Sequence, residues 1–373
     1  MPTSPTSLYI HIPFCRSKCP YCDFYSSRSP EKIEAYFGAV KDEITTLRRL
    51  SPFVTDSLHC EVFDTVYFGG GTPSVLGGDN LAAILDTARQ NFIIDNNAEI
   101  TAEVNPSVDS PDLFFGTLKN AGFNRISMGL QSAVDSERRI LGRTADADTV
   151  RSCVLSAKNS GFTNISLDIM LGIPNQTIDT LKYTIDFALS LGVTHLSCYM
   201  LQLEEGTWFY RNQHRLNLPD DDTVADMYLF MCDTLKAHGM RHYEISNFCF
   251  DNLLSRHNMK YWTLSPYIGI GPSAHSFYNG RRFFFNKDTD AFISGLHAEY
   301  DCDGGDLEEK IMLALRTDMG IEEKYIPDPQ KLKPLFDNAL ITRQNDRISL
   351  TDKGFLLSNS IIASIMQNAE CIM

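Results

Sequence analysis

Short apolar runs alternate with longer amphipathic segments over roughly the first 200 residues of the chain. The short runs are rich in β-branched and aromatic residues and end at glycine or polar positions, which is typical of strands. The longer segments repeat their apolar positions every three to four residues, which is typical of helices. Strands are therefore predicted at residues 9–14, 64–68, 98–104, 125–129, 164–170 and 195–200.

Helices are predicted between these strands, at residues 33–50, 81–91, 149–159 and 180–191. Strands that alternate with helices indicate right-handed βαβ units and a parallel sheet, which is an α/β fold. Six units in about 200 residues favour a partial (β/α)6 barrel that is open on one side over a closed eight-stranded barrel. A doubly wound sheet is the alternative architecture.

The pattern changes near residue 302. Helices are predicted at residues 307–316 and 330–338, a hairpin at 341–343 and 347–350, and a final helix capped by Thr351. This order of elements resembles a winged-helix unit with α+β character. The chain is thus divided into a partial barrel (1–240), an extension (241–300) and a C-terminal winged-helix-like domain (301–373).

Composition and charge narrow the function classes. The 373 residues are 43% hydrophobic and 21% charged, which is ordinary for a globular protein with a sizeable core. A net charge of −14 disfavours binding of nucleic acid through a basic surface. No apolar run is long enough to predict a transmembrane helix, although peripheral membrane contact stays open, and the first residues lack the pattern of a secretory signal. A cytoplasmic location is expected.

Three cysteines lie close together after the first strand: Cys15, Cys19 and Cys22. In a cytoplasmic protein, clustered cysteines indicate metal binding more than disulfides. Zinc sites and ordinary iron–sulfur clusters take four protein ligands, but no fourth cysteine follows here, since position 24 is phenylalanine. Three ligands would leave one metal position open to a small molecule. The alternative is a zinc site completed by a distant cysteine or histidine.

Further candidate residues fall where the predicted strands end, which is where ligands gather in parallel α/β folds. Glycines after the second strand let a ligand approach the backbone closely. Asp168 lies inside an apolar strand, where a carboxylate needs a partner. The alternative is that these polar residues only bridge neighbouring strands. The candidates at the strand ends are Gly70, Gly71, Thr72, Glu103, Gln131, Arg143 and Asp168.

The C-x3-C-x2-C loop after the first strand resembles that of the radical S-adenosylmethionine (SAM) superfamily. This resemblance implies a [4Fe–4S] cluster on the three cysteines, with the amino and carboxylate groups of SAM at the fourth iron. The segments at residues 9–15, 68–74, 129–132, 168–174 and 243–247 resemble the coproporphyrinogen dehydrogenase group in particular. Carried over by position, the SAM contacts are Tyr9, Gly70, Gly71, Thr72, Glu103, Gln131, Arg143 and Asp168, with Tyr21 near the adenine and Gln202 and His275 as weaker candidates.

Position 24 separates two subfamilies of this group. The dehydrogenases carry a further cysteine there. This chain has Phe24 at that position and in this respect resembles the heme chaperone subfamily. That subfamily also carries an H-N-x-x-Y-W motif, found here at residues 257–262. The resemblance implies that His257 contacts heme, because histidine is a common axial ligand of heme iron. Without the family, His257 would be interpreted as a structural residue.

We therefore expect a heme chaperone-like protein that binds a [4Fe–4S] cluster, SAM and heme and delivers heme to apoproteins. The alternative is an oxygen-independent coproporphyrinogen III dehydrogenase, an oxidoreductase that decarboxylates the propionates of its porphyrinogen substrate. A zinc-binding α/β protein with an unrelated small-molecule site is the third hypothesis. Whether SAM is cleaved stays open.

Overall fold

The computed structural model describes residues 5–326 and 328–366. The first four residues, which belong to the segment predicted to lack a secretory signal, lie outside the described residues. Six strands pair in sequence order, and every one of these pairs is parallel, as the alternating pattern predicts. The partial (β/α)6 barrel is therefore confirmed. Its strands are β1 (Thr6–Ile12), β2 (Val62–Gly70), β3 (Ile93–Val104), β4 (Arg125–Gln131), β5 (Asn164–Leu171) and β6 (His195–Met200).

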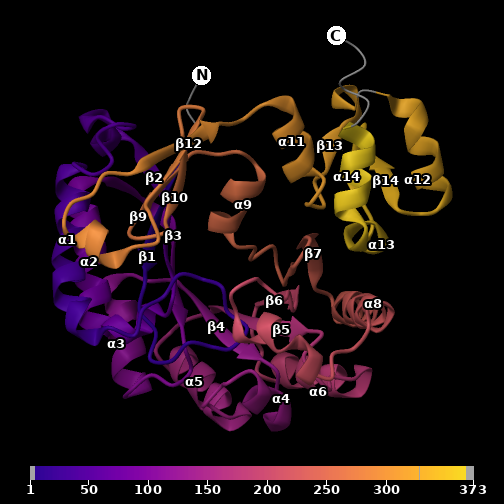
Figure 1. Cartoon of the computed structure of the whole chain (residues 1–373), viewed down its shortest axis with the longest axis horizontal. Coiled ribbons are helices and arrows are strands. Elements are labelled where there is room, and N and C mark those ends of the chain that lie inside the picture. The colour runs from indigo at the N-terminus through magenta and orange to yellow at the C-terminus, as the bar shows by residue number, and fades with distance from the viewer. Residues whose placement is uncertain (1–4, 327, 367–373) are drawn as a thin grey trace.

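Helices cover the outer face of this arc of strands (Figure 1). Side-chain caps begin several of them: Asp146 accepts from the Thr149 amide, and Thr177 accepts from the Thr180 amide. The first helix ends four residues before its predicted end, because Leu47 adopts a left-handed conformation with φ 49°. The helices are α1 (Ile33–Thr46), α2 (Gly78–Asn91), α3 (Pro111–Ala121), α4 (Asp135–Ile140), α5 (Ala147–Asn159), α6 (Ile178–Ser190), α7 (Trp208–Arg211) and α8 (Asp221–Ala237).

Shorter strands extend the sheet at both edges, and the sequence pattern did not predict them. One edge gains β8 (Asn247–Cys249) and β7 (Arg241–Glu244), which run antiparallel. The other edge gains β9 (Tyr267–Ile270), parallel to β1, and then an antiparallel series. That series consists of β10 (His275–Tyr278), β11 (Arg281–Phe284) and β12 (Glu299–Asp303).

Helix α9 (Arg256–Trp262) lies inside the ring, between β9 and β7 (Figure 1). It packs against β2 and β3, which lie in the middle of the twelve-stranded sheet. Helix α10 (Thr289–Ile293) follows between β11 and β12 and packs beside α1. The H-N-x-x-Y-W motif forms most of α9, so the motif lies inside the barrel.

The C-terminal unit has the winged-helix-like arrangement that the sequence predicts. A three-stranded antiparallel sheet in the order β13-β15-β14 packs with short helices. The predicted final helix is two helices, because the chain breaks at Leu357. Within residues 5–326 and 328–366, no helix is long and apolar enough to cross a membrane. The elements are α11 (Leu307–Ala314), β13 (Ile321–Glu322), α12 (Lys333–Asp337), β14 (Ile341–Gln344), β15 (Arg347–Leu350), α13 (Asp352–Leu356) and α14 (Ser358–Met366).

Candidate functional site

A cavity of about 490 Å³ lies on the inner side of the strand arc and reaches up to the cysteine loop. It is lined by every residue that the sequence predicts for the cluster and by most of those predicted for SAM. Gln202 and His275, the weaker candidates, are exposed and lie outside the described lining. The lining brings together Tyr9, Cys15, Cys19, Tyr21, Cys22, Gly70, Gly71, Thr72, Glu103, Gln131, Arg143 and Asp168.

The cysteine loop leaves β1 where Pro13, which has no amide donor, ends the strand. Two backbone hydrogen bonds with Ser27 hold the ends of the loop together: its amide donates to Pro13 O at 2.6 Å, and its carbonyl accepts from Cys15 N at 3.0 Å. Inside the loop, Cys22 N donates to Cys19 O at 3.2 Å. All three thiols are free. The fold thus holds three metal-ligating side chains on one short, closed loop.

Two opposing influences act on the ionisation of one thiol of this loop. Burial raises the pKa of Cys22, while the nearby Lys18 ammonium acts in the opposite direction. A coordinating metal ionises such a thiol outright, so a buried thiol that resists ionisation alone is compatible with ligation. Cys15 also lies next to the second strand end, with its Sγ 3.2 Å from Thr72 Oγ1. The donor set fits an iron–sulfur cluster with one open position.

Gly70 and Gly71, at the end of β2, expose their backbone at the cavity, and we call these two residues the glycine wall. Gly70 has φ +113°, and a Cβ there would lie 2.7 Å from the His11 ring. At Gly71 a Cβ would lie 2.8 Å from Phe14 O, and the amide of Gly71 donates to Ile12 O at 2.8 Å. Side chains at these positions would displace the segment that leads into the cysteine loop. Glycine therefore brings the backbone of β2 against that segment and to the edge of the cavity.

Two carboxyl groups face the cavity from β3 and β5. The Glu103 carboxylate accepts a hydrogen bond of 2.8 Å from the Tyr67 hydroxyl, and burial raises the pKa of Glu103 to about 7. Burial also raises the pKa of Asp168 to about 6, although Arg143 and then Arg125 oppose this shift. Groups with such pKa values can accept hydrogen bonds from the ammonium or ribose hydroxyls of a ligand.

We expect the stability of the SAM-free protein to fall as the pH rises from about 4.5 to about 7. The folded protein retains a proton on Glu103 up to about pH 7, whereas the unfolded chain loses it near the ordinary value of 4.5. The free energy of unfolding should decrease over this window by on the order of 3 kcal/mol from this group. Urea unfolding at several pH values would show a flatter dependence for Glu103→Gln. A dependence unchanged by Glu103→Gln, and equal to that of the exposed Glu308→Gln control, would contradict the expectation.

Arg143 and Gln131 complete the wall on the side of β4. The Arg143 Nε atom is buried and has no hydrogen-bond partner among the described residues. A Cβ at Gly129 would lie only 2.4 Å from Arg143 Nη2, so the guanidinium occupies space that this glycine leaves free. Gln131 sits at a register shift with φ +67° and accepts from the Tyr199 hydroxyl at 2.7 Å. An unsatisfied guanidinium beside the cavity fits a ligand carboxylate.

Arg125 is a cavity residue that the sequence analysis missed. It begins β4, is only 2% exposed, and its Nε atom lacks a partner within the described chain. A charged residue at the start of an apolar strand was the available signal, because such a residue seldom enters a core without a role. His195, which begins β6, lines the same inner part of the cavity. The structure therefore adds a polar inner end to the predicted site.

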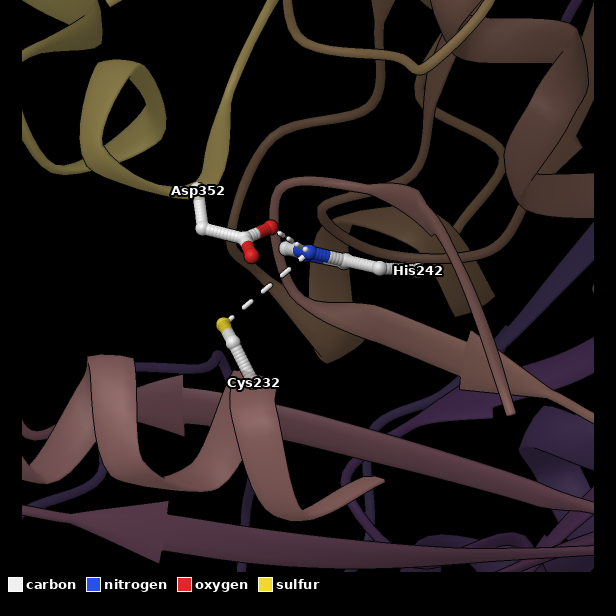
Figure 2. A group of neighbouring side chains, drawn as sticks. All are labelled: Cys232, His242 and Asp352. Carbon is white, nitrogen blue, oxygen red and sulfur yellow. Dashed lines mark hydrogen bonds and ion pairs between the residues drawn. The ribbon is translucent and has the colours of Figure 1, made fainter. Parts of the chain in front are cut away.

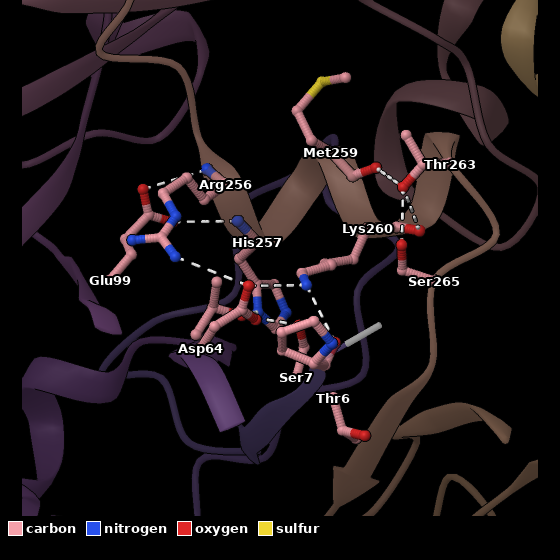
Figure 3. Close-up of polar contacts among 12 residues, drawn as sticks. Thr6, Ser7, Asp64, Glu99, Arg256, His257, Met259, Lys260, Thr263 and Ser265 are labelled. Atoms are coloured by element: carbon pink, nitrogen blue, oxygen red, sulfur yellow. Dashed lines mark hydrogen bonds and ion pairs between the residues drawn. The ribbon is translucent and has the colours of Figure 1, made fainter. Parts of the chain in front are cut away.

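His257 is 1% exposed and lies against β2 (Figure 3). Its Nδ1 is 2.8 Å from Thr65 Oγ1, and its Nε2 is 2.9 Å from the Tyr261 hydroxyl. The ring stacks on Tyr67 with centroids 4.9 Å apart. Both ring nitrogens are occupied in this conformation, so contact between His257 and a heme iron requires α9 to move.

Buried polar contacts hold α9 in place (Figure 3). The Glu99 carboxylate of β3 accepts from two backbone amides of the helix, Arg256 N and His257 N, both at 3.0 Å. The Lys260 ammonium lies 2.8 Å from Asp64 Oδ2 of β2, and both side chains are largely buried. These contacts attach the motif helix to the strands from which the cavity is built.

Comparison with known proteins identifies close relatives over the whole chain. The Radical SAM superfamily model matches residues 9–188. The chain is 32% identical over 380 residues to the heme chaperone HemW of Mycobacterium tuberculosis, covering 98% of this chain and 96% of that one. It is 33% identical to the heme chaperone HemW of Bacillus subtilis, covering 96% of this chain and 99% of that one. These matches extend through the C-terminal unit.

A solved structure has the same fold. The coproporphyrinogen III oxidase (HemN) from Escherichia coli, described as a radical SAM enzyme, superposes with a TM-score of 0.82. The match covers 98% of this chain and 91% of that one, at 22% sequence identity. The likeness supports the predicted architecture, including the C-terminal unit.

Proposed function

Because the chain belongs to the heme chaperone HemW family within the radical SAM superfamily, we propose that it binds heme and delivers it to apoproteins. The observation that carries this proposal is the end-to-end match to heme chaperones, which includes the C-terminal unit as well as the barrel. We place the protein in the cytoplasm, where a chaperone would meet newly made recipient proteins.

The cavity would hold the [4Fe–4S] cluster on Cys15, Cys19 and Cys22, with SAM beside it. When bound, the cluster supplies a redox-active iron with an open position for the amino and carboxylate groups of SAM. Arg143 would pair with the SAM carboxylate, because its buried Nε lacks a partner in the described chain. The remaining contacts would come from the glycine wall and from hydrogen-bond acceptors: Tyr9, Tyr21, Gly70, Gly71, Thr72, Glu103, Gln131 and Asp168.

Phe24 distinguishes the chaperone from the dehydrogenase alternative. Its side chain lines the cavity and is 72% exposed. A phenyl ring can neither ligate a metal nor transfer a proton, so this position cannot perform the chemistry of a cysteine. A flat exposed ring at the cavity edge is instead suited to packing against an aromatic ligand.

We propose further that His257 reaches the heme iron only after α9 withdraws from the strands. Heme would then compete with the closed state that the Glu99 carboxylate stabilises through two backbone amides. A ligand binds with a weakened apparent affinity when the binding-competent state of the protein is rarely populated. Loosening the closed state should therefore strengthen heme binding.

A heme titration of two single variants tests this arrangement. We expect Glu99→Gln to raise the apparent heme affinity by up to about tenfold, because it weakens hydrogen bonds from amides to a charged acceptor. We expect His257→Ala to lower the affinity by roughly tenfold, because the iron loses a nitrogen ligand. Changes in the Soret absorption would report binding by both variants and by the unsubstituted protein.

The opposite directions of the two effects separate ligation from mere support of the fold. If His257 were only structural, both substitutions would disturb the same packing and change heme affinity in the same direction. Met259→Ala, on the same helix, serves as a control for general disturbance of α9. The enzyme hypothesis would replace the chaperone hypothesis if the unsubstituted protein did not bind stoichiometric heme and converted coproporphyrinogen III under anaerobic conditions.

A further inference from the structure

Three side chains with metal-ligating atoms meet outside the lining of the cavity (Figure 2). Cys232 comes from α8, His242 from β7 and Asp352 from the first turn of α13. Their ligand atoms all lie within 4.8 Å of one another. The Cys232 Sγ is 4.0 Å from His242 Nδ1, and that nitrogen is 2.9 Å from Asp352 Oδ1. Sulfur, nitrogen and oxygen therefore converge on one point from three elements.

Cys232 and His242 are buried, Asp352 is partly buried, and neighbouring residues hold these side chains in position. The His242 ring stacks on Phe248 with centroids 4.1 Å apart, and Phe355 lies against it at 5.0 Å. The second oxygen of Asp352 is fixed by the Lys236 ammonium at 2.5 Å. Asp352 thus presents one oxygen to the cluster while the other is hydrogen-bonded, which is the usual arrangement of a carboxylate that ligates a metal.

The geometry argues against a nucleophilic role for Cys232. In a cysteine–histidine–aspartate relay, the nucleophile and the carboxylate contact opposite nitrogens of the imidazole. Here both the thiol and the carboxylate face the same nitrogen, Nδ1. The imidazole therefore cannot pass a proton between them. A single ion that binds all three atoms explains the convergence better.

We propose that Cys232 Sγ, His242 Nδ1 and Asp352 Oδ1 form a zinc site. This mixture of thiolate, imidazole and carboxylate matches the preference of Zn²⁺, and a water molecule would complete four-coordination. On binding, the Cys232 thiol loses its proton to solvent, and a neutral His242 carries its proton on Nε2 instead of Nδ1. The two anionic ligands balance the charge of the ion, and Lys236 remains paired with Asp352.

The site would join the C-terminal unit to the barrel. Asp352 belongs to that unit, whereas the other two ligands belong to α8 and β7. The junction also contains the Arg241–Asp318 ion pair at 2.6 Å, and Phe355 of the C-terminal unit packs against His242. An ion that binds only the assembled form stabilises it by mass action. Zinc would therefore hold the winged-helix-like unit against the barrel.

The test uses full-length protein in which Cys15, Cys19 and Cys22 are replaced by serine, so that the cluster loop cannot take up zinc. After equilibration with zinc and removal of free metal, we expect one zinc ion per chain. Co²⁺ in place of zinc should give the absorption of a tetrahedral site with a thiolate ligand. Cys232→Ser and Asp352→Asn in this background should each weaken zinc binding by at least roughly tenfold.

Cys153→Ser, which removes a buried cysteine from α5, is the matched control and should leave zinc binding unchanged. Asp352→Asn retains the size of the side chain, so it tests ligation even if Cys232→Ser fails to fold. Absence of bound zinc, or zinc retained by both ligand variants, would overturn the proposal. Heme and SAM binding are measured separately, so failure here would not be confused with failure of the chaperone function.

Discussion

A Cys19→Ser variant is expected to lose its iron–sulfur cluster almost completely on anaerobic reconstitution. The loop provides three cysteine thiols at the cavity, and the described lining contains no other cysteine that could take over. A serine hydroxyl does not ionise readily and is a poor ligand for iron, so two thiolates would remain for a cluster that needs three. Iron and sulfide per chain, together with visible charge-transfer absorption, measure the loss.

SAM affinity should fall with the cluster by at least roughly tenfold, which is about 1.4 kcal/mol. Calorimetric titration under anaerobic conditions would report it. Cys249→Ser, a buried cysteine of β8 outside the cavity lining, is the matched control and should retain iron, sulfide and SAM binding. If Cys19→Ser retained bound iron and SAM affinity, the assignment of the cavity would be wrong.

The second large effect is expected from Gly71→Val. A Cβ at this position would lie 2.8 Å from Phe14 O and 3.0 Å from Ile12 O, and both are backbone atoms that cannot rotate away. The added side chain would push the entry to the cysteine loop away from β2. Overpacking of this kind costs about 1–3 kcal/mol. We expect SAM affinity to fall roughly tenfold or more, as measured by calorimetry on reconstituted protein.

Gly116→Ala provides the control for this substitution. It lies in α3, and a Cβ there meets nothing within 4 Å, so it should leave SAM binding unchanged and stabilise the helix by about 0.5–1 kcal/mol. Urea unfolding of both variants would separate a global loss of stability from a local effect on the cavity. SAM affinity equal to that of the unsubstituted protein in Gly71→Val would show that the glycine wall does not position the ligand.

The six parallel strands were predictable because short segments rich in β-branched and aromatic residues alternate with longer amphipathic segments, which is the pattern of consecutive βαβ units. The edge strands were not predictable. Strand β8 has three residues and β9 has four, which is too short for a period to emerge from the sequence. Their positions depend on pairing with β6, about 50 residues earlier in the chain, and with β1, about 260 residues earlier.

The candidate site was likewise predictable from the sequence only in part. The cysteine spacing and the polar residues at strand ends identified most of the cavity, because parallel strands place their carboxyl ends at one edge. Arg125 was missed because it begins β4, whereas candidate residues were sought at the carboxyl ends of the strands. The occupied nitrogens of His257 also follow from contacts with Thr65 and Tyr261 that no local pattern specifies.

The sequence by itself determined the cysteine loop, the parallel core and the family, because these depend on residues that are close together or on periodic burial. Only the tertiary structure decided that α9 packs inside the barrel against β2 and β3 and that Cys232, His242 and Asp352 meet. The contacts of His242 with Asp352 and of His257 with Glu99 join segments separated by more than a hundred residues. Such contacts arise from the packing of whole elements, which local sequence does not encode.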